Sequence, residues 1–262
     1  MTLEQIKQNL QEIERKNNVR ILTAVESGSR AWGFASPDSD WDVRFIYVHP
    51  LRWYLQVESG RDVIEVLTDE GFDAVGWDLR KALSLFRKTN PSMLEWLMSP
   101  VRYIDNDGFA EMLMSLIPNY FNPTRGLYHY YSMGVNHNVR YLLKNGITLK
   151  RFLYYLRSLL ACKWIMSHKT PAPVMFNELV DNIVTDTEVK DAIVRLIAKK
   201  SICKEHDKDT VDPILIEYAY TTQDEITDYL QSVSLPEPDR DKDDLLDDLL
   251  YRLSAVTSIP TI

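Results

Sequence analysis

Short apolar runs separated by polar turns fill the first hundred residues of the chain. Residues 20–25 and 43–48 are apolar, β-branched and aromatic, which predicts two strands. Residues 3–15 repeat Ile6, Leu10 and Ile13 at helical spacing and predict a helix with one face on the sheet. The pattern predicts further strands over 53–57 and 61–67, and an extended segment over 72–75.

Two helices are predicted to complete this first half. Residues 77–88 carry apolar side chains at helical spacing and end before Asn90-Pro91. Asp78 fits the first turn of this helix, where a carboxylate meets the positive helix end. Residues 92–97 are expected to form a short helix, with Ser92 as its cap and Glu95 as the partner of that cap.

After Pro100 the apolar spacing becomes helical throughout. Helices are predicted over residues 108–116, 127–143, 148–168, 176–181, 188–200, 213–220 and 242–253. The last of these carries a leucine stripe, which indicates that it docks on this chain or on a partner. The predicted class is therefore α+β: a small mixed β-sheet domain with flanking helices over residues 1–108, followed by an all-helical lobe over 109–262.

The polar turn between the first two strands carries the candidate chemistry. Side chains two apart on a strand share a face, so Asp40 and Asp42 are expected to point the same way. Two neighbouring carboxylates repel each other, and a hard dication with oxygen ligands would offset that repulsion. Gly28 and Ser29 follow the preceding strand, where a glycine lets backbone approach a phosphate. This combination is typical of phosphoryl or nucleotidyl transfer.

A purely structural interpretation also exists for this turn. The segment from Ser36 to Asp40 is ordinary turn chemistry, because proline fixes one dihedral angle and Asp or Ser caps nearby amides. Arg44, on the same strand face as Asp42, would then form a structural ion pair with it. Turn chemistry explains Asp40 but leaves Asp42, inside a strand pattern, without a reason.

The amino-acid sequence around this turn resembles that of a known group of enzymes. Gly28-Ser29, a spacer of about ten residues and Asp40-Trp41-Asp42 are similar to the signature of the nucleotidyltransferases related to DNA polymerase beta. The longer segment GSRAWGFASPDSDWDVRFIYV, with GWDLRKAL, NPSMLEW and LYYLRSLLACKWI further on, resembles the predicted nucleotidyltransferase family associated with RNA repair.

This resemblance implies a metal-dependent enzyme that moves a nucleoside monophosphate from an NTP to an acceptor hydroxyl. Asp40 and Asp42 would hold Mg²⁺ or Mn²⁺, and a third carboxylate would come from a neighbouring strand. Asp73 is the chosen candidate for that third position, as metal ligand or general base, with Asp62 and Glu65 as competitors. Gly28 and Ser29 would grip the terminal phosphates, and Arg30 would assist or turn to solvent.

The charge distribution adds a second candidate surface. The formal net charge is −8, which argues against a general duplex-DNA binder. Residues 112–177 contain no Asp or Glu, although eight cations fall inside. On the predicted helix over 148–168, Lys150, Tyr154 and Arg157 share one face, which suits a triphosphate or an RNA backbone. The alternative is that the two cations are solvated and that Tyr154 packs in the core.

The expected acceptor is RNA, such as a damaged tRNA end, as the resemblance implies. Alternatives are transfer of the nucleotide to a protein or a small molecule, and a binding module without turnover. No apolar run reaches bilayer length, so no membrane association is expected. Cys162 and Cys203 lack metal-site spacing and are expected to be plain thiols in a reducing cytoplasm.

Overall fold

The centre of the molecule is a mixed five-stranded sheet in the order β3-β4-β2-β1-β5. The computed structural model describes the chain except residues 69–70, 136–146, 203–207, 235–243 and 257–262. The strands are β1 (Arg20–Glu26), β2 (Trp41–Val48), β3 (Val63–Leu67), β4 (Phe72–Asp78) and β5 (Arg102–Asp105). The β2–β4 pair is parallel and the other pairs are antiparallel, which confirms the predicted mixed sheet.

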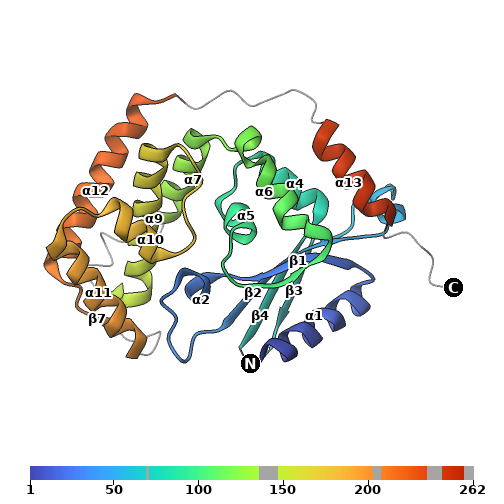
Figure 1. The fold of residues 1–262 in the computed structure, drawn as a ribbon, viewed down its shortest axis with the longest axis horizontal. Helices are drawn as coiled ribbons and strands as arrows, with labels where there is room; N and C mark the ends of the chain where they lie inside the picture. Colours follow the sequence, from blue (N-terminus) through green and yellow to red (C-terminus); the bar gives the residue numbers. More distant parts are fainter. Residues whose placement is uncertain (69–70, 136–146, 203–207, 235–243, 257–262) are drawn as a thin grey trace.

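One face of the sheet is covered by α1 (Leu3–Asn17) (Figure 1). Thr2 caps this helix in a reciprocal arrangement with Gln5. Its buried side chains pack against Val43, Phe45 and Tyr47, alternate residues of β2, while Trp41 is partly buried against the same core. Asp42 and Arg44 therefore project from the opposite face of β2, as the period of two predicts.

The opposite face of the sheet packs against α4 (Leu79–Arg87), α5 (Pro91–Leu97), α6 (Phe109–Tyr120) and α13 (Asp244–Val256). Leu246 and Leu249 of α13 are buried in this core, and α13 contacts α4 and α3 (Leu51–Tyr54). The leucine stripe thus docks on this chain. The predicted division at residue 108 stays a prediction, and these contacts show that α6 and α13 complete the core on the sheet.

A helical lobe stands beside the sheet (Figure 1) and confirms the predicted helical second half. It comprises α7 (Pro123–Val135), α9 (Leu149–His168), α10 (Phe176–Ile183), α11 (Thr187–Ile202) and α12 (Pro213–Ser232). The central helix α9 buries residues on most of its circumference. A short ladder joins β6 (Ile147–Thr148) to β7 (Lys208–Asp209), and η1 (Asn106–Gly108) leads into α6. Within the ranges described, no helix combines the length and apolar character needed to cross a bilayer.

Three local predictions were wrong: one strand, the start of one helix and the cap of another. Residues 53–57 are not a strand: α3 begins after Pro50, Trp53 stacks on His49 at 4.0 Å, and the Tyr54 hydroxyl donates to Asp78. The helix predicted from Trp77 begins at Leu79, because Trp77 is still paired within the sheet.

Asp78 is the N-cap of α4 and accepts a hydrogen bond from the Arg80 amide at 2.9 Å, in line with its predicted helix-end role. The cap of α5 is Asn90, which accepts from the Met93 amide, instead of Ser92. Glu95, predicted to serve that cap, points into the protein interior and is 6% exposed.

Candidate active site

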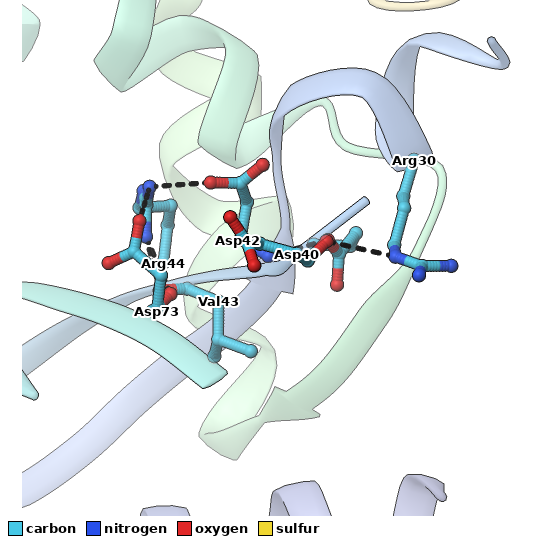
Figure 2. Close-up of polar contacts among 7 residues, drawn as sticks. Arg30, Asp40, Asp42, Val43, Arg44 and Asp73 are labelled. Atoms are coloured by element: carbon cyan, nitrogen blue, oxygen red, sulfur yellow. Dashed lines mark hydrogen bonds and ion pairs between the residues drawn. The ribbon is translucent and has the colours of Figure 1, made fainter. Parts of the chain in front are cut away.

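Two carboxylates face each other on the neighbouring parallel strands β2 and β4. Asp42 and Asp73 are register partners, so their side chains leave the same face of the sheet side by side (Figure 2). Asp40 precedes β2 directly and its residue is exposed. The structure therefore brings together Asp42 and Asp73, two of the three predicted carboxylates, with Asp40 two residues along the chain.

The competitors for the third position lie elsewhere. Asp62 and Glu65 belong to the β3 side of the sheet, and β4 separates that strand from β2. Asp62 pairs with Lys81 at 3.1 Å, and Glu65 pairs with Arg61. Asp73 is thus the acid positioned beside Asp42, and its role as ligand or base stays a prediction.

Arg44 lies between the two carboxylates (Figure 2). Its Nη2 donates to Asp42 Oδ1 at 2.9 Å and to Asp73 Oδ2 at 3.0 Å, while Nη1 donates to the carbonyls of Asp73 and Val43. The arginine side chain is 16% exposed. The ion pair expected under the structural interpretation is therefore present, and it extends to a second acid.

The surroundings of the Asp42 carboxyl group act on its pKa in both directions. Burial, which removes water from the charged form, is the largest cause and raises its pKa above the ordinary value; Asp73 and Asp40 add to the rise. Arg44 and Lys150 oppose the shift. Lys150 lies at the beginning of α9, so a cation from the helical lobe acts on a carboxylate of the sheet.

The Gly-Ser pair forms the start of α2 (Gly28–Trp32), a short helix, at the edge of this site. Gly28 has a φ of +59°, and a Cβ on it would lie 2.2 Å from Asp42 Oδ2. Only glycine fits, both for its dihedral angle and for the space. Ser29 is 2% exposed, so a phosphate contact by its hydroxyl stays a prediction.

Arg30 supports the turn that leads to Asp40. Its Nε donates to the carbonyl of Asp40 at 3.0 Å and its Nη2 to that of Ser39 at 2.7 Å, and the guanidinium covers the Trp41 ring at 4.1 Å. From the other side, the buried Lys200 of α11 donates to Ser36 and Ser39. Arg30 is therefore engaged with the protein backbone, and contact with nucleotide stays a prediction for it.

Glu26, the last residue of β1, is a site residue that the sequence reasoning missed. It is 1% exposed; its Oε1 accepts from the Asp42 amide at 2.9 Å, and its Oε2 accepts from the Tyr103 hydroxyl. Burial is the largest cause of its raised pKa. The available signal was an acid that ends an apolar strand directly before Ser27-Gly28.

The cationic stripe on α9 is only partly as expected. Arg157 is 2% exposed and its Nη1 is 2.8 Å from Glu95 Oε1, so the expectation that no acid neutralises it was wrong. The glutamate comes from α5, outside the acid-free segment. We therefore assign Arg157 to a structural ion pair. Tyr154 packs edge-on against Trp32 of α2 at 4.7 Å, and its contact with nucleotide stays a prediction.

The chemical type of the candidate ligands suits a hard divalent cation. Carboxylate oxygens are the ligands that Mg²⁺ prefers, and Asp42 and Asp73 are adjacent. Within the described ranges, no group of three or more His, Cys, Asp or Glu residues is close enough to hold a metal. Arg44 lies between Asp42 and Asp73. The Asp40 side chain lies close to Gly71, because a Cβ built on Gly71 would be 3.2 Å from Asp40 Oδ1. Asp42 and Asp73 are thus the acids best placed to hold a cation.

Comparisons with known proteins agree with the geometry. A family model described as RlaP, RNA repair pathway DNA polymerase beta family, matches residues 3–252. The uncharacterized protein YcgL of Bacillus subtilis (strain 168) is 39% identical over 230 residues, which cover 88% of this chain and 88% of YcgL. With paired carboxylates on adjacent strands and a Gly-Ser helix beside them, this chain belongs to the RNA repair pathway family of DNA polymerase beta-like nucleotidyltransferases.

Proposed function

We propose that this protein transfers a nucleoside monophosphate from an NTP to a hydroxyl group of RNA, such as a damaged tRNA end, and releases pyrophosphate. The observation that carries the proposal is the in-register pair of Asp42 and Asp73, with Gly28 packed against Asp42. The RNA acceptor is supported by the family to which the chain belongs.

Asp42 and Asp73, together with Asp40, would hold Mg²⁺ or Mn²⁺. A divalent cation there supplies charge neutralisation for the phosphoryl group under attack. Asp73 is 33% exposed at its side chain, which leaves it accessible to an acceptor hydroxyl whose proton it would take. Lys150 would attract the triphosphate, since its charge already reaches Asp42. Gly28 would leave the phosphates room to approach backbone amides.

One observation favours a second candidate, a nucleotide-binding or RNA-binding module without turnover. Arg44 already pairs with both Asp42 and Asp73, and its single positive charge offsets part of their repulsion without a metal. Arg44 binds Oδ1 of Asp42 and Oδ2 of Asp73, so a metal would be held through the other carboxylate oxygens or would displace the arginine. A direct assay of transfer separates the two candidates.

The assay incubates purified protein with Mg²⁺, total RNA and each NTP in turn, labelled at the α-phosphate. Label is expected in RNA, and Asp42→Asn is expected to abolish it, because the substitution removes a ligand at nearly constant volume. Glu65→Gln is the matched control, since Glu65 is an exposed acid at the sheet edge. Full activity of Asp42→Asn would contradict the metal assignment.

The other readouts of the same assay identify the alternatives. Label in the protein fraction, or in a small molecule, would show that the acceptor is that molecule instead of RNA. NTP binding without any labelled product would support the module without turnover. Omission of the divalent cation, or its removal with a chelator, is expected to abolish labelling.

A further inference from the structure

A buried polar cluster joins the Gly-Ser helix to the helical lobe. Glu95 of α5 is its centre: Oε1 accepts from Tyr130 at 2.7 Å and from Arg157 at 2.8 Å, and Oε2 accepts from the Trp32 indole at 3.1 Å. The Arg157 guanidinium also covers the Trp32 ring at 4.3 Å and donates to the carbonyl of Val174. Four helices, α2, α5, α7 and α9, therefore meet at one carboxylate.

Burying this polar cluster costs free energy, so its position between α2 and the other helices calls for an explanation. Glu95 and Arg157 have side chains 7% and 3% exposed. Burying two charges costs desolvation free energy, which their attraction offsets only where the geometry is good and the remaining polar groups are hydrogen-bonded. Apolar packing alone would join these helices with less penalty. What the polar cluster adds is a fixed direction for the Trp32 indole, because a hydrogen bond has a required geometry.

Trp32 ends a helix of five residues whose first residue touches the active site. At the start of α2, the Ser27 amide donates to the Asp42 carbonyl at 2.9 Å, and Gly28 packs against the Asp42 carboxylate. Just after its end, Phe34 is buried in the core of the helical lobe and meets Phe176 edge-on. One turn of helix thus links Asp42 to the Glu95 cluster.

We propose that Glu95 and Trp32 are positioning residues: they anchor α2 to α5 and, through Tyr130 and Arg157, to the helical lobe, and so fix the Gly28-Ser29 backbone at the distance from Asp42 that NTP binding requires. This inference rests on the proposed function, because it assigns the nucleotide phosphates to that turn. It also gives the helical lobe a role besides supplying cations, since the lobe helps to hold the phosphate-binding turn in place.

Two variants that each remove one hydrogen-bond donor to Glu95 test this assignment. Trp32→Phe removes the indole donor of α2, whereas Tyr130→Phe removes a hydroxyl donor of α7, and both donors bind Glu95. Both are expected to lower the melting temperature. Only Trp32→Phe is expected to weaken binding of labelled NTPs in equilibrium dialysis with Mn²⁺, by about 10-fold, the lower range for lost supporting contacts. In the transfer assay, KM for NTP should rise while KM for RNA stays unchanged.

Hydrogen exchange provides a readout that does not depend on nucleotide. The amides of residues 31–34 are expected to exchange faster in Trp32→Phe and at the native rate in Tyr130→Phe. Equal effects of the two variants on exchange and on NTP affinity would overturn the inference, because they would show that the cluster only stabilises the fold. If the native protein binds no NTP, the proposed function fails, and the exchange comparison still decides whether Trp32 anchors α2.

Discussion

Gly28 and Asp42 are in close contact in the candidate site. The glycine adopts a left-handed φ of +59°, and its missing Cβ leaves the space that Asp42 Oδ2 fills. The Asp42 main chain is held from the other side, because its amide donates to the buried Glu26. The carboxylate is therefore fixed by contacts on both sides, which is the arrangement expected of a group that must hold a set position.

Gly28→Ala is expected to reduce transfer by about 100-fold, the cost typical of a 1 Å displacement at a reacting centre. The added methyl group would lie 2.2 Å from Asp42 Oδ2 and must push the carboxylate aside. The left-handed φ adds about 1 kcal/mol of strain for an L-residue. Steady-state kinetics with labelled NTP, together with a melting curve, measure the two effects.

Gly108→Ala is the matched control for this prediction. Gly108 also has a positive φ, +63°, but a Cβ on it would meet nothing within 4 Å. Gly108→Ala should lose only the stability that the left-handed φ costs, whereas Gly28→Ala also carries the clash with Asp42 and should lose activity. Similar activity in the two variants would show that the clash with Asp42 has no role in catalysis.

At the scale of elements, the spacing of apolar residues predicted the features that depend on which face of an element is buried. The faces of β2, the helix α1 and the length of α9 follow from apolar spacing. Asp73 was chosen because the family resemblance asks for a third acid on a neighbouring strand, and the structure places it beside Asp42 on the parallel strand β4. The helix α3 was missed because Pro50 and the contact between Tyr54 and Asp78 override the strand preference of residues 53–57.

The electrostatic neighbours of α9 could not be predicted from the sequence. The segment 112–177 has no acid, yet Arg157 pairs with Glu95 of α5 and Lys163 with Glu225 of α12. These partners are 62 residues away in the chain in each case. A segment without acids therefore does not predict an electropositive surface, because tertiary contacts bring acids to it. Each cation has to be assessed by its own surroundings.

Lys150 is the cation of α9 whose surroundings support contact with nucleotide. It acts on Asp42 electrostatically, and Thr148 caps the helix end from which it projects. Lys150→Gln is expected to raise KM for NTP by about 10-fold, since a hydrogen bond to a charged group contributes about 1.5 kcal/mol or more. Arg151→Gln, at the next, exposed position, is expected to leave KM unchanged. An equal rise in both variants would indicate a diffuse charge effect.

At the scale of the whole molecule, α13 packs in the core over the sheet. It packs on α3 and α4, which follow the carboxyl ends of β2 and β4, whereas Asp42 and Asp73 lie near the amino ends of the same strands. The end of the sequence therefore completes the core over the sheet on the side away from the site. From the sequence, the leucine stripe predicted docking but not the surface, because the leucines alone do not specify which apolar face they meet.

This separation predicts a variant that loses stability without losing catalysis. Leu249 is 3% exposed in the core shared with the sheet, so Leu249→Ala should lower the free energy of unfolding by about 2–4 kcal/mol in urea titrations. Leu245 on the same helix is 45% exposed, and Leu245→Ala should stay within about 0.5 kcal/mol of the native protein. At a temperature where both variants are folded, kcat and KM should match the native values. A loss of activity in folded Leu249→Ala would mean that α13 transmits its packing to Asp42 and Asp73 through β2 and β4.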